Sequence, residues 1–79
     1  MQPVYYYVVP VDDGWRVKAS GFVWEHRTRD DALAFAEASA RHYAESTGHL
    51  TYIRLRDQED ASLRPYAHFG GNSADPQRG

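Results

Sequence analysis

Hydrophobic and polar positions between residues 29 and 47 alternate with the period of an α-helix. At about 100° per residue, Glu37, Arg41 and Glu45 fall on one side, spaced as on a solvated helix face. The opposite stripe is apolar and consists mostly of alanine, with Phe35 and Ser39 on its flank: Ala32, Leu33, Ala36, Ala40, Tyr43 and Ala44. The pattern predicts one amphipathic helix over Arg29–Thr47.

Both ends of this helix carry capping signals. Thr28 precedes it and Asp31 follows three residues later, which is the capping-box spacing with Asp in place of Glu or Gln. Gly48 comes directly after Thr47 and can adopt the left-handed conformation that ends many helices. A helix lined by alanine can lie close to a sheet, so the bulk of the core must come from strands.

The remaining segments are rich in β-branched and aromatic residues, as strands are. Pro65 interrupts the last of them and places it at a sheet edge. The predicted strands are Val4–Val11, Trp15–Ser20, Phe22–Arg27, His49–Arg56 and Ala61–Phe69. The fourth shows apolar residues at both parities, which indicates either a bulge near Tyr52 or partial cover on both faces.

The resulting order is β-β-β-α-β-β, and short loops favour antiparallel neighbours. We therefore expect an α+β fold in which a curved antiparallel β-sheet carries one packed helix. Residues 1–70 form a single domain in this interpretation. Residues 71–79 have low hydrophobicity and many turn formers, so we expect a disordered C-terminal tail.

The first hairpin has two possible registers around Asp12–Gly14. A three-residue loop pairs Val9 with Val17 and is the register that we favour. A two-residue loop would instead turn Tyr6 and Val8 toward the core, because a slip of one residue reverses the faces of a strand.

Composition narrows the possible functions. The chain has 79 residues, no cysteine and a net charge of −2, with a pI near 6.0. The absence of cysteine excludes disulfides and thiolate chemistry. The charge gives no general attraction to nucleic acid or to an anionic membrane. No apolar run approaches the roughly 18 residues of a membrane span, and the N-terminus lacks a basic signal region, so we expect a cytoplasmic protein.

Several segments together resemble a known family. They are Tyr6-Tyr7-Val8-Val9-Pro10, Gly14-Trp15-Arg16-Val17-Lys18, the alanine-rich helix opened by Thr28, and Gly48-His49-Leu50. Over about residues 5–70 the chain resembles DUF2188, a family of small uncharacterised bacterial proteins. It departs from that pattern at Asp57-Gln58, where Asp-Gly is usual, and at Phe69-Gly70, where Tyr-Gly is usual. The resemblance implies the element order and no activity.

Candidate catalytic and metal-binding groups do not form a recognisable motif. The histidines His26, His42, His49 and His68 lack metal-ligand spacing, although His26 could neighbour His49 or His68 across strands. The carboxylates cluster in two turns, Asp12-Asp13 and Asp57–Asp60, where general acid–base chemistry is rare. We therefore predict no enzyme activity, no metal and no cofactor.

One helix can cover only one face of a five-stranded sheet. We predict that the other face is an interaction surface formed by Tyr6, Val8, Arg16, Lys18, Val23, Ile53 and Leu55. Self-association as a homodimer, or binding of a protein partner, is the first hypothesis for this surface. Binding of single-stranded nucleic acid is the alternative, supported by aromatic and basic residues but opposed by the net charge. A third interpretation assigns the aromatic residues to the core alone.

Overall fold

The computed structural model describes residues 3–57 and 62–70. The chain follows the predicted order β-β-β-α-β-β, and the bounds are β1 Val4–Val11, β2 Gly14–Ala19, β3 Phe22–His26, α1 Arg29–Thr47, β4 Thr51–Leu55 and β5 Arg64–Phe69. The predicted acidic turn beyond Asp57 and the predicted disordered tail lie outside the described residues.

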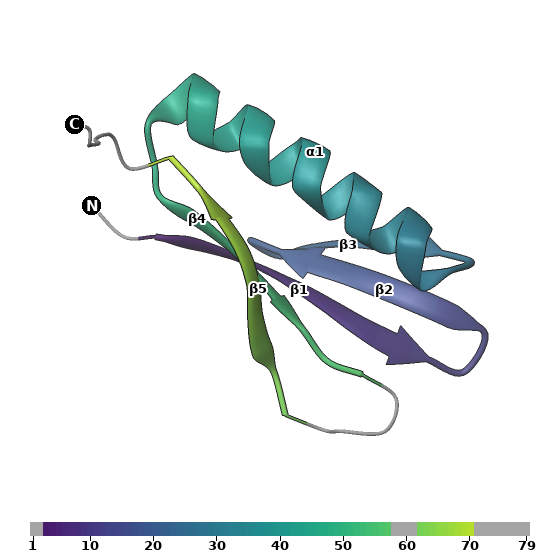
Figure 1. Cartoon of the computed structure of the whole chain (residues 1–79). Helices are drawn as coiled ribbons and strands as arrows, with labels where there is room; N and C mark the ends of the chain where they lie inside the picture. Colours follow the sequence, from purple (N-terminus) through teal and green to yellow (C-terminus); the bar gives the residue numbers. More distant parts are fainter. Residues whose placement is uncertain (1–2, 58–61, 71–79) are drawn as a thin grey trace.

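The five strands form one sheet in the order β3-β2-β1-β4-β5, with α1 lying across one side (Figure 1). Neighbouring strands are antiparallel except β1 and β4, which are parallel. The α+β class is therefore confirmed, whereas the prediction of a purely antiparallel sheet is wrong. The 19-residue helix returns the chain to the end where β3 began, so β4 runs in the direction of β3 and β1.

The helix begins and ends at the predicted residues. The Thr28 side-chain oxygen accepts a hydrogen bond from the Asp31 N–H at 3.0 Å. At the other end Gly48 has a φ of 78°, and its N–H donates to the Ala44 carbonyl at 2.8 Å. Both caps satisfy backbone groups that have no partner inside the helix.

The core lies between α1 and the sheet. The helix contributes its small stripe, with Ala32, Leu33, Ala36, Ala40 and Ala44 buried. The bulk comes from the sheet, as expected, through Tyr6, Val8, Trp15, Val17, Ile53 and Leu55. The alanines let the helix approach, and the larger strand side chains fill the space.

The first hairpin has a two-residue loop, so the favoured three-residue register is wrong. Val8 pairs with Val17, and Val11 pairs with Gly14. Gly14 thus belongs to β2 and not to the loop. A Cβ atom at Gly14 would collide with the His26 carbonyl oxygen, so the residue is required for this close approach of two backbones.

The pairing of β4 with β5 contains one irregularity. The register shifts between Ile53 and Arg54, so Tyr66 has no paired residue on β4. The extra residue lies in β5, whereas β4 alternates regularly between buried and half-buried residues, so both faces of β4 are partly covered, the second of the two possibilities raised by the sequence. The Tyr66 hydroxyl donates a hydrogen bond to Glu37 of α1 at 2.9 Å, which joins the edge strand to the helix.

Candidate functional site

The seven residues of the predicted interaction surface do not share one face. Four of them, Tyr6, Val8, Ile53 and Leu55, lie beneath α1 with at most 9% of their surface exposed. The other three, Arg16, Lys18 and Val23, pair at positions of the opposite parity and lie on the uncovered side of the sheet. The prediction of a single surface containing all seven is therefore wrong. Its cause is the hairpin register, because one residue of slip exchanges the two faces.

Tyr6 lies beneath the helix and not on an exposed surface. Its hydroxyl lies 2.9 Å from the Ser39 hydroxyl of α1, and its ring lies 6.5 Å from that of Trp24. Only 5% of its surface is exposed. Tyr6 therefore anchors the helix to the sheet and is not accessible to a partner.

We call the uncovered side of the sheet the open face. It carries the side chains whose pairing positions alternate with the buried ones: Tyr5, Tyr7, Val9, Val11, Arg16, Lys18, Val23, Glu25, Tyr52, Arg54 and His68. Sequence reasoning missed Tyr5, Tyr7 and Tyr52 as surface residues. The signal that could have found them is the run of apolar residues at both parities of β1, which requires half of them to lie away from the helix.

Three tyrosines of the open face form what we call the tyrosine row. Tyr7 and Tyr5 stack with centroids 6.1 Å apart and planes inclined by 18°. Tyr5 and Tyr52, on neighbouring strands, stack at 5.2 Å and 16°. His68 extends the row on β5, with its ring 6.0 Å from that of Tyr52. The three tyrosines are half-buried, so part of each side chain remains accessible to a ligand.

Cations flank the tyrosine row. Tyr7 pairs with Lys18 on one side and with Arg54 on the other. The Arg54 guanidinium also lies over the Tyr5 ring, 5.4 Å from its centroid, in cation–π geometry. Holding Arg54 against a ring orders its side chain before any ligand arrives, which lowers the entropy lost on binding.

The balance of charge on the open face differs from that of the whole chain. Arg16 pairs with Glu25 at 2.8 Å, whereas no carboxylate among the described residues forms an ion pair with Lys18 or Arg54. Three cations therefore face one carboxylate on the open face. Asp12 and Asp13 lie at the β1–β2 turn, at one end of this surface.

A shallow hollow of about 260 Å³ lies beside Tyr7 at the β2–β3 turn. Its lining is mainly apolar and includes Tyr7, Lys18, Phe22 and Val23. A second hollow, of about 420 Å³, lies at the acidic end between Asp12, Asp13, Arg16 and Glu25. The first hollow places an apolar recess and a cation beside the tyrosine row, a combination that suits a flat, partly anionic ligand.

Comparisons with protein-family models, curated proteins and solved structures found no match to this chain. The resemblance to DUF2188 therefore stays a prediction.

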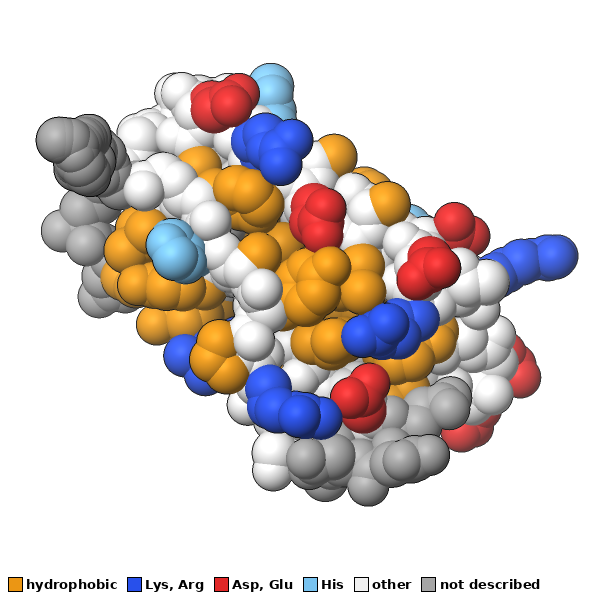
Figure 2. Space-filling view, in the orientation of Figure 1, with side chains coloured by type: hydrophobic (Ala, Val, Ile, Leu, Met, Phe, Trp, Pro, Cys, Tyr) orange, Lys and Arg blue, Asp and Glu red, His pale blue; other side chains and the backbone are white. Residues whose placement is uncertain are grey.

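The helix side of the molecule differs from the open face. Figure 2 shows acidic and basic side chains interspersed over α1 and β5, with hydrophobic side chains between them. The hydrogen bond to Glu37 raises the pKa of Tyr66 above its ordinary value of 10.0, because ionisation would remove the donated proton and leave a second negative charge beside that carboxylate.

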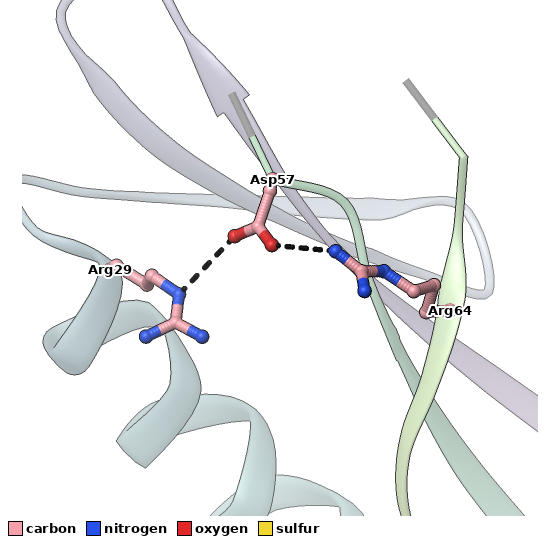
Figure 3. A network of polar contacts seen from close by, with 3 residues as sticks. All are labelled: Arg29, Asp57 and Arg64. Atoms are coloured by element: carbon pink, nitrogen blue, oxygen red, sulfur yellow. Dashed lines mark hydrogen bonds and ion pairs between the residues drawn. The ribbon is translucent and has the colours of Figure 1, made fainter. Parts of the chain in front are cut away.

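A small polar network closes one end of the helix side (Figure 3). Asp57, just after β4, contacts Arg64 at 3.0 Å and Arg29 at 3.8 Å. All three side chains are at least 40% exposed, so solvent screens the network and it contributes little to stability. It joins the starts of α1 and β5.

The histidines His26, His49 and His68 each contact a different aromatic ring. His26 contacts Phe35 at 5.0 Å, and His49 contacts Tyr43 at 5.8 Å. The proposed approach of His26 to His68 does not occur, because β3 and β5 lie at opposite edges of the sheet. Within residues 3–57 and 62–70 no three His, Asp or Glu side chains converge as metal ligands, and no helix is long and apolar enough to cross a membrane.

Proposed function

We propose that the open face binds single-stranded nucleic acid and that the protein is a binding module without catalytic activity. The observation that carries this proposal is the tyrosine row, with Lys18 and Arg54 on either side of Tyr7. Single strands bind to proteins through bases stacked on aromatic rings and through phosphates held by nearby cations.

The net charge of −2 argues less against this function than the sequence suggests. Interactions between exposed charges are largely screened beyond about 10 Å at moderate ionic strength, so the local balance matters most. The surroundings of the tyrosine row are locally cationic, whereas the helix side carries the acidic residues of α1, which are Asp30, Asp31, Glu37 and Glu45. A strand lying along the tyrosine row would meet mainly Lys18 and Arg54.

The charges also oppose a face-to-face homodimer. Stacking two open faces would bring Lys18 and Arg54 of both copies toward one another, with Glu25 already paired to Arg16. Like charges brought together in an interface cost free energy unless a counter-charge separates them. An anionic partner satisfies the same cations, so nucleic acid fits the open face better than a second copy does.

The direct test is fluorescence anisotropy with a labelled oligothymidylate of about 12 nucleotides, within the usual site size of single-strand binders. We expect binding that Tyr52→Ala weakens about 5- to 150-fold, the effect of losing one stacked base. Tyr66→Ala is the matched control, since Tyr66 is 42% exposed but lies against α1.

Salt dependence provides the second readout. The logarithm of the binding constant should fall linearly with the logarithm of salt concentration, and Lys18→Gln should reduce the slope by about 0.7. No binding at about 100 μM protein would overturn the proposal. Binding that Tyr52→Ala leaves unchanged, in a variant with a native circular dichroism spectrum, would do the same.

A further inference from the structure

Strand β3 is an edge strand without the usual protection against pairing. It pairs with β2 on one side, and no described strand lies along its other side (Figure 1). Its five residues pair with β2 without a bulge and include no proline and no lysine. The opposite edge, β5, carries Pro65 and a register shift, both of which discourage a further strand.

Exposed apolar side chains flank this edge on both sides of the sheet. Phe22 is 66% exposed and Val23 is 53% exposed, the two largest values among the exposed large hydrophobic residues described. Phe22 lies on the helix side, where its ring stacks on Trp24 at 5.9 Å. Val23 lies on the open face, beside the hollow next to Tyr7. A strand added here would therefore have apolar contacts above and below its backbone.

We infer that β3 pairs antiparallel with β3 of a second copy of this chain. The β2–β3 hairpin has a two-residue turn, with a φ of 50° at Ser20 and 84° at Gly21, and Ala19 pairs with Phe22 next to it. In such a hairpin the pair that closes the turn exchanges both backbone hydrogen bonds. The N–H and C=O groups of Val23 therefore point away from β2, toward an added strand.

A two-fold axis at Val23 makes this edge complementary to itself. It sets Val23 against Val23 of the second copy on the open face and Phe22 against Trp24 of the second copy on the helix side. Glu25 of each copy falls opposite Gly21 of the other, so the two carboxylates are not brought together. Pairing of the two β3 strands keeps the Glu25 carboxylates apart, whereas stacking of two open faces would bring like charges together. A second copy of the chain is therefore a suitable partner for the β3 edge.

The pairing would place both open faces on the same side of one continuous ten-stranded sheet. If the proposed function holds, the two tyrosine rows then form a longer surface for one oligonucleotide, which raises affinity through the effective concentration of the second site. This consequence rests on the proposed function, whereas the dimer itself does not.

The experiment is the solution mass by light scattering on a sizing column, at about 10 and 100 μM. We expect twice the 9.0 kDa of the chain at the higher concentration. Val23→Lys and Phe22→Glu should each give a monomer with a native circular dichroism spectrum, because they place charge on an exposed edge. Leu63→Lys is the matched control: Leu63 is 40% exposed, lies outside β3, and its substitution should leave a dimer.

A monomer of the unaltered protein at both concentrations would overturn the inference, as would dimers of both edge variants. The result is separate from nucleic-acid binding. Tyr52→Ala should remain a dimer, and the unaltered protein, diluted until light scattering gives the mass of one chain, should still bind an oligothymidylate of about 6 nucleotides, short enough for one tyrosine row. A change that abolishes the dimer and leaves short-oligonucleotide binding intact acts at the β3 edge. A change that abolishes this binding and leaves the dimer intact acts at the open face.

Discussion

Tyr6 and its neighbours Tyr5 and Tyr7 occupy opposite faces of the same strand and have different roles. Tyr6 is 5% exposed, touches Ser39 and Trp24, and lies under the helix. Tyr5 and Tyr7 are half-buried and stack on each other beside Lys18 and Arg54. Three identical residues in a row thus divide between anchoring the helix and forming a surface, because side chains alternate along a strand.

The two faces of the sheet remove their apolar side chains from water in different ways. The covered face gains from a helix whose alanines permit close approach, so its large side chains are removed from water. The open face has no such cover and shields its apolar rings by stacking them together and under Arg54. The free energy of unfolding should therefore depend mainly on the covered face, and the proposed binding of nucleic acid mainly on the open face.

The largest expected difference in the free energy of unfolding is between Tyr6→Ala and Tyr7→Ala. Tyr6→Ala removes a buried ring and should lower the free energy of unfolding by about 3–5 kcal/mol, a large part of the stability of a small domain. Tyr7→Ala, the matched control, should lower it by about 1 kcal/mol, the worth of a stacked pair. Urea unfolding followed by circular dichroism measures both. Equal losses would mean that the two faces are not energetically distinct.

A second expected difference in stability is between leucine substitutions at a buried and at an exposed alanine of the helix. Ala40 is completely buried, so Ala40→Leu should overpack the core and lower the free energy of unfolding by about 1–3 kcal/mol. Ala34 is exposed on the same helix, and Ala34→Leu should leave stability almost unchanged. Thermal unfolding of the two variants tests this contrast. A harmless Ala40→Leu would indicate that the helix does not approach the sheet closely.

The hydroxyl of Tyr6 should contribute less to stability than its ring does. Tyr6→Phe keeps the ring and removes the partner of the Ser39 hydroxyl, so it should lower the free energy of unfolding by about 1 kcal/mol. Tyr52→Phe on the open face serves as the control and should change stability little. Urea midpoints of the two proteins give the comparison, and a greater loss for Tyr52→Phe would contradict the assigned faces.

The smallest expected effect is a dependence of stability on alkaline pH. The hydrogen bond to Glu37 raises the pKa of Tyr66 in the folded protein. The contribution of Tyr66 to the free energy of unfolding is therefore fully present below the unfolded-state pKa of 10.0. It is lost as the pH rises through the higher folded-state pKa, because the unfolded chain releases the proton first. Unfolding midpoints of the wild type and Tyr66→Phe between about pH 9 and 11 test this. The wild type should lose more stability over that range.

Much of the fold could be predicted because its signals are local. The helix bounds follow from Thr28, Gly48 and the alanine stripe, and the strands follow from segments rich in β-branched and aromatic residues. The hairpin register could not be predicted, because Asp12-Asp13-Gly14 permits loops of two or three residues. The structure has the two-residue loop, with Gly14 in β2 and close to the His26 carbonyl, a contact between residues 12 positions apart.

The sequence by itself determined the number, order and type of elements in this protein and the need for strands to fill a core beneath an alanine-lined helix. Only the tertiary structure decided which face each strand residue occupies and that β4 runs parallel to β1. Capping and periodicity act within a few residues, so the chain encodes them locally. Strand direction and register depend on where the 19-residue helix returns the chain and on which backbones can touch, and those are properties of the packed whole.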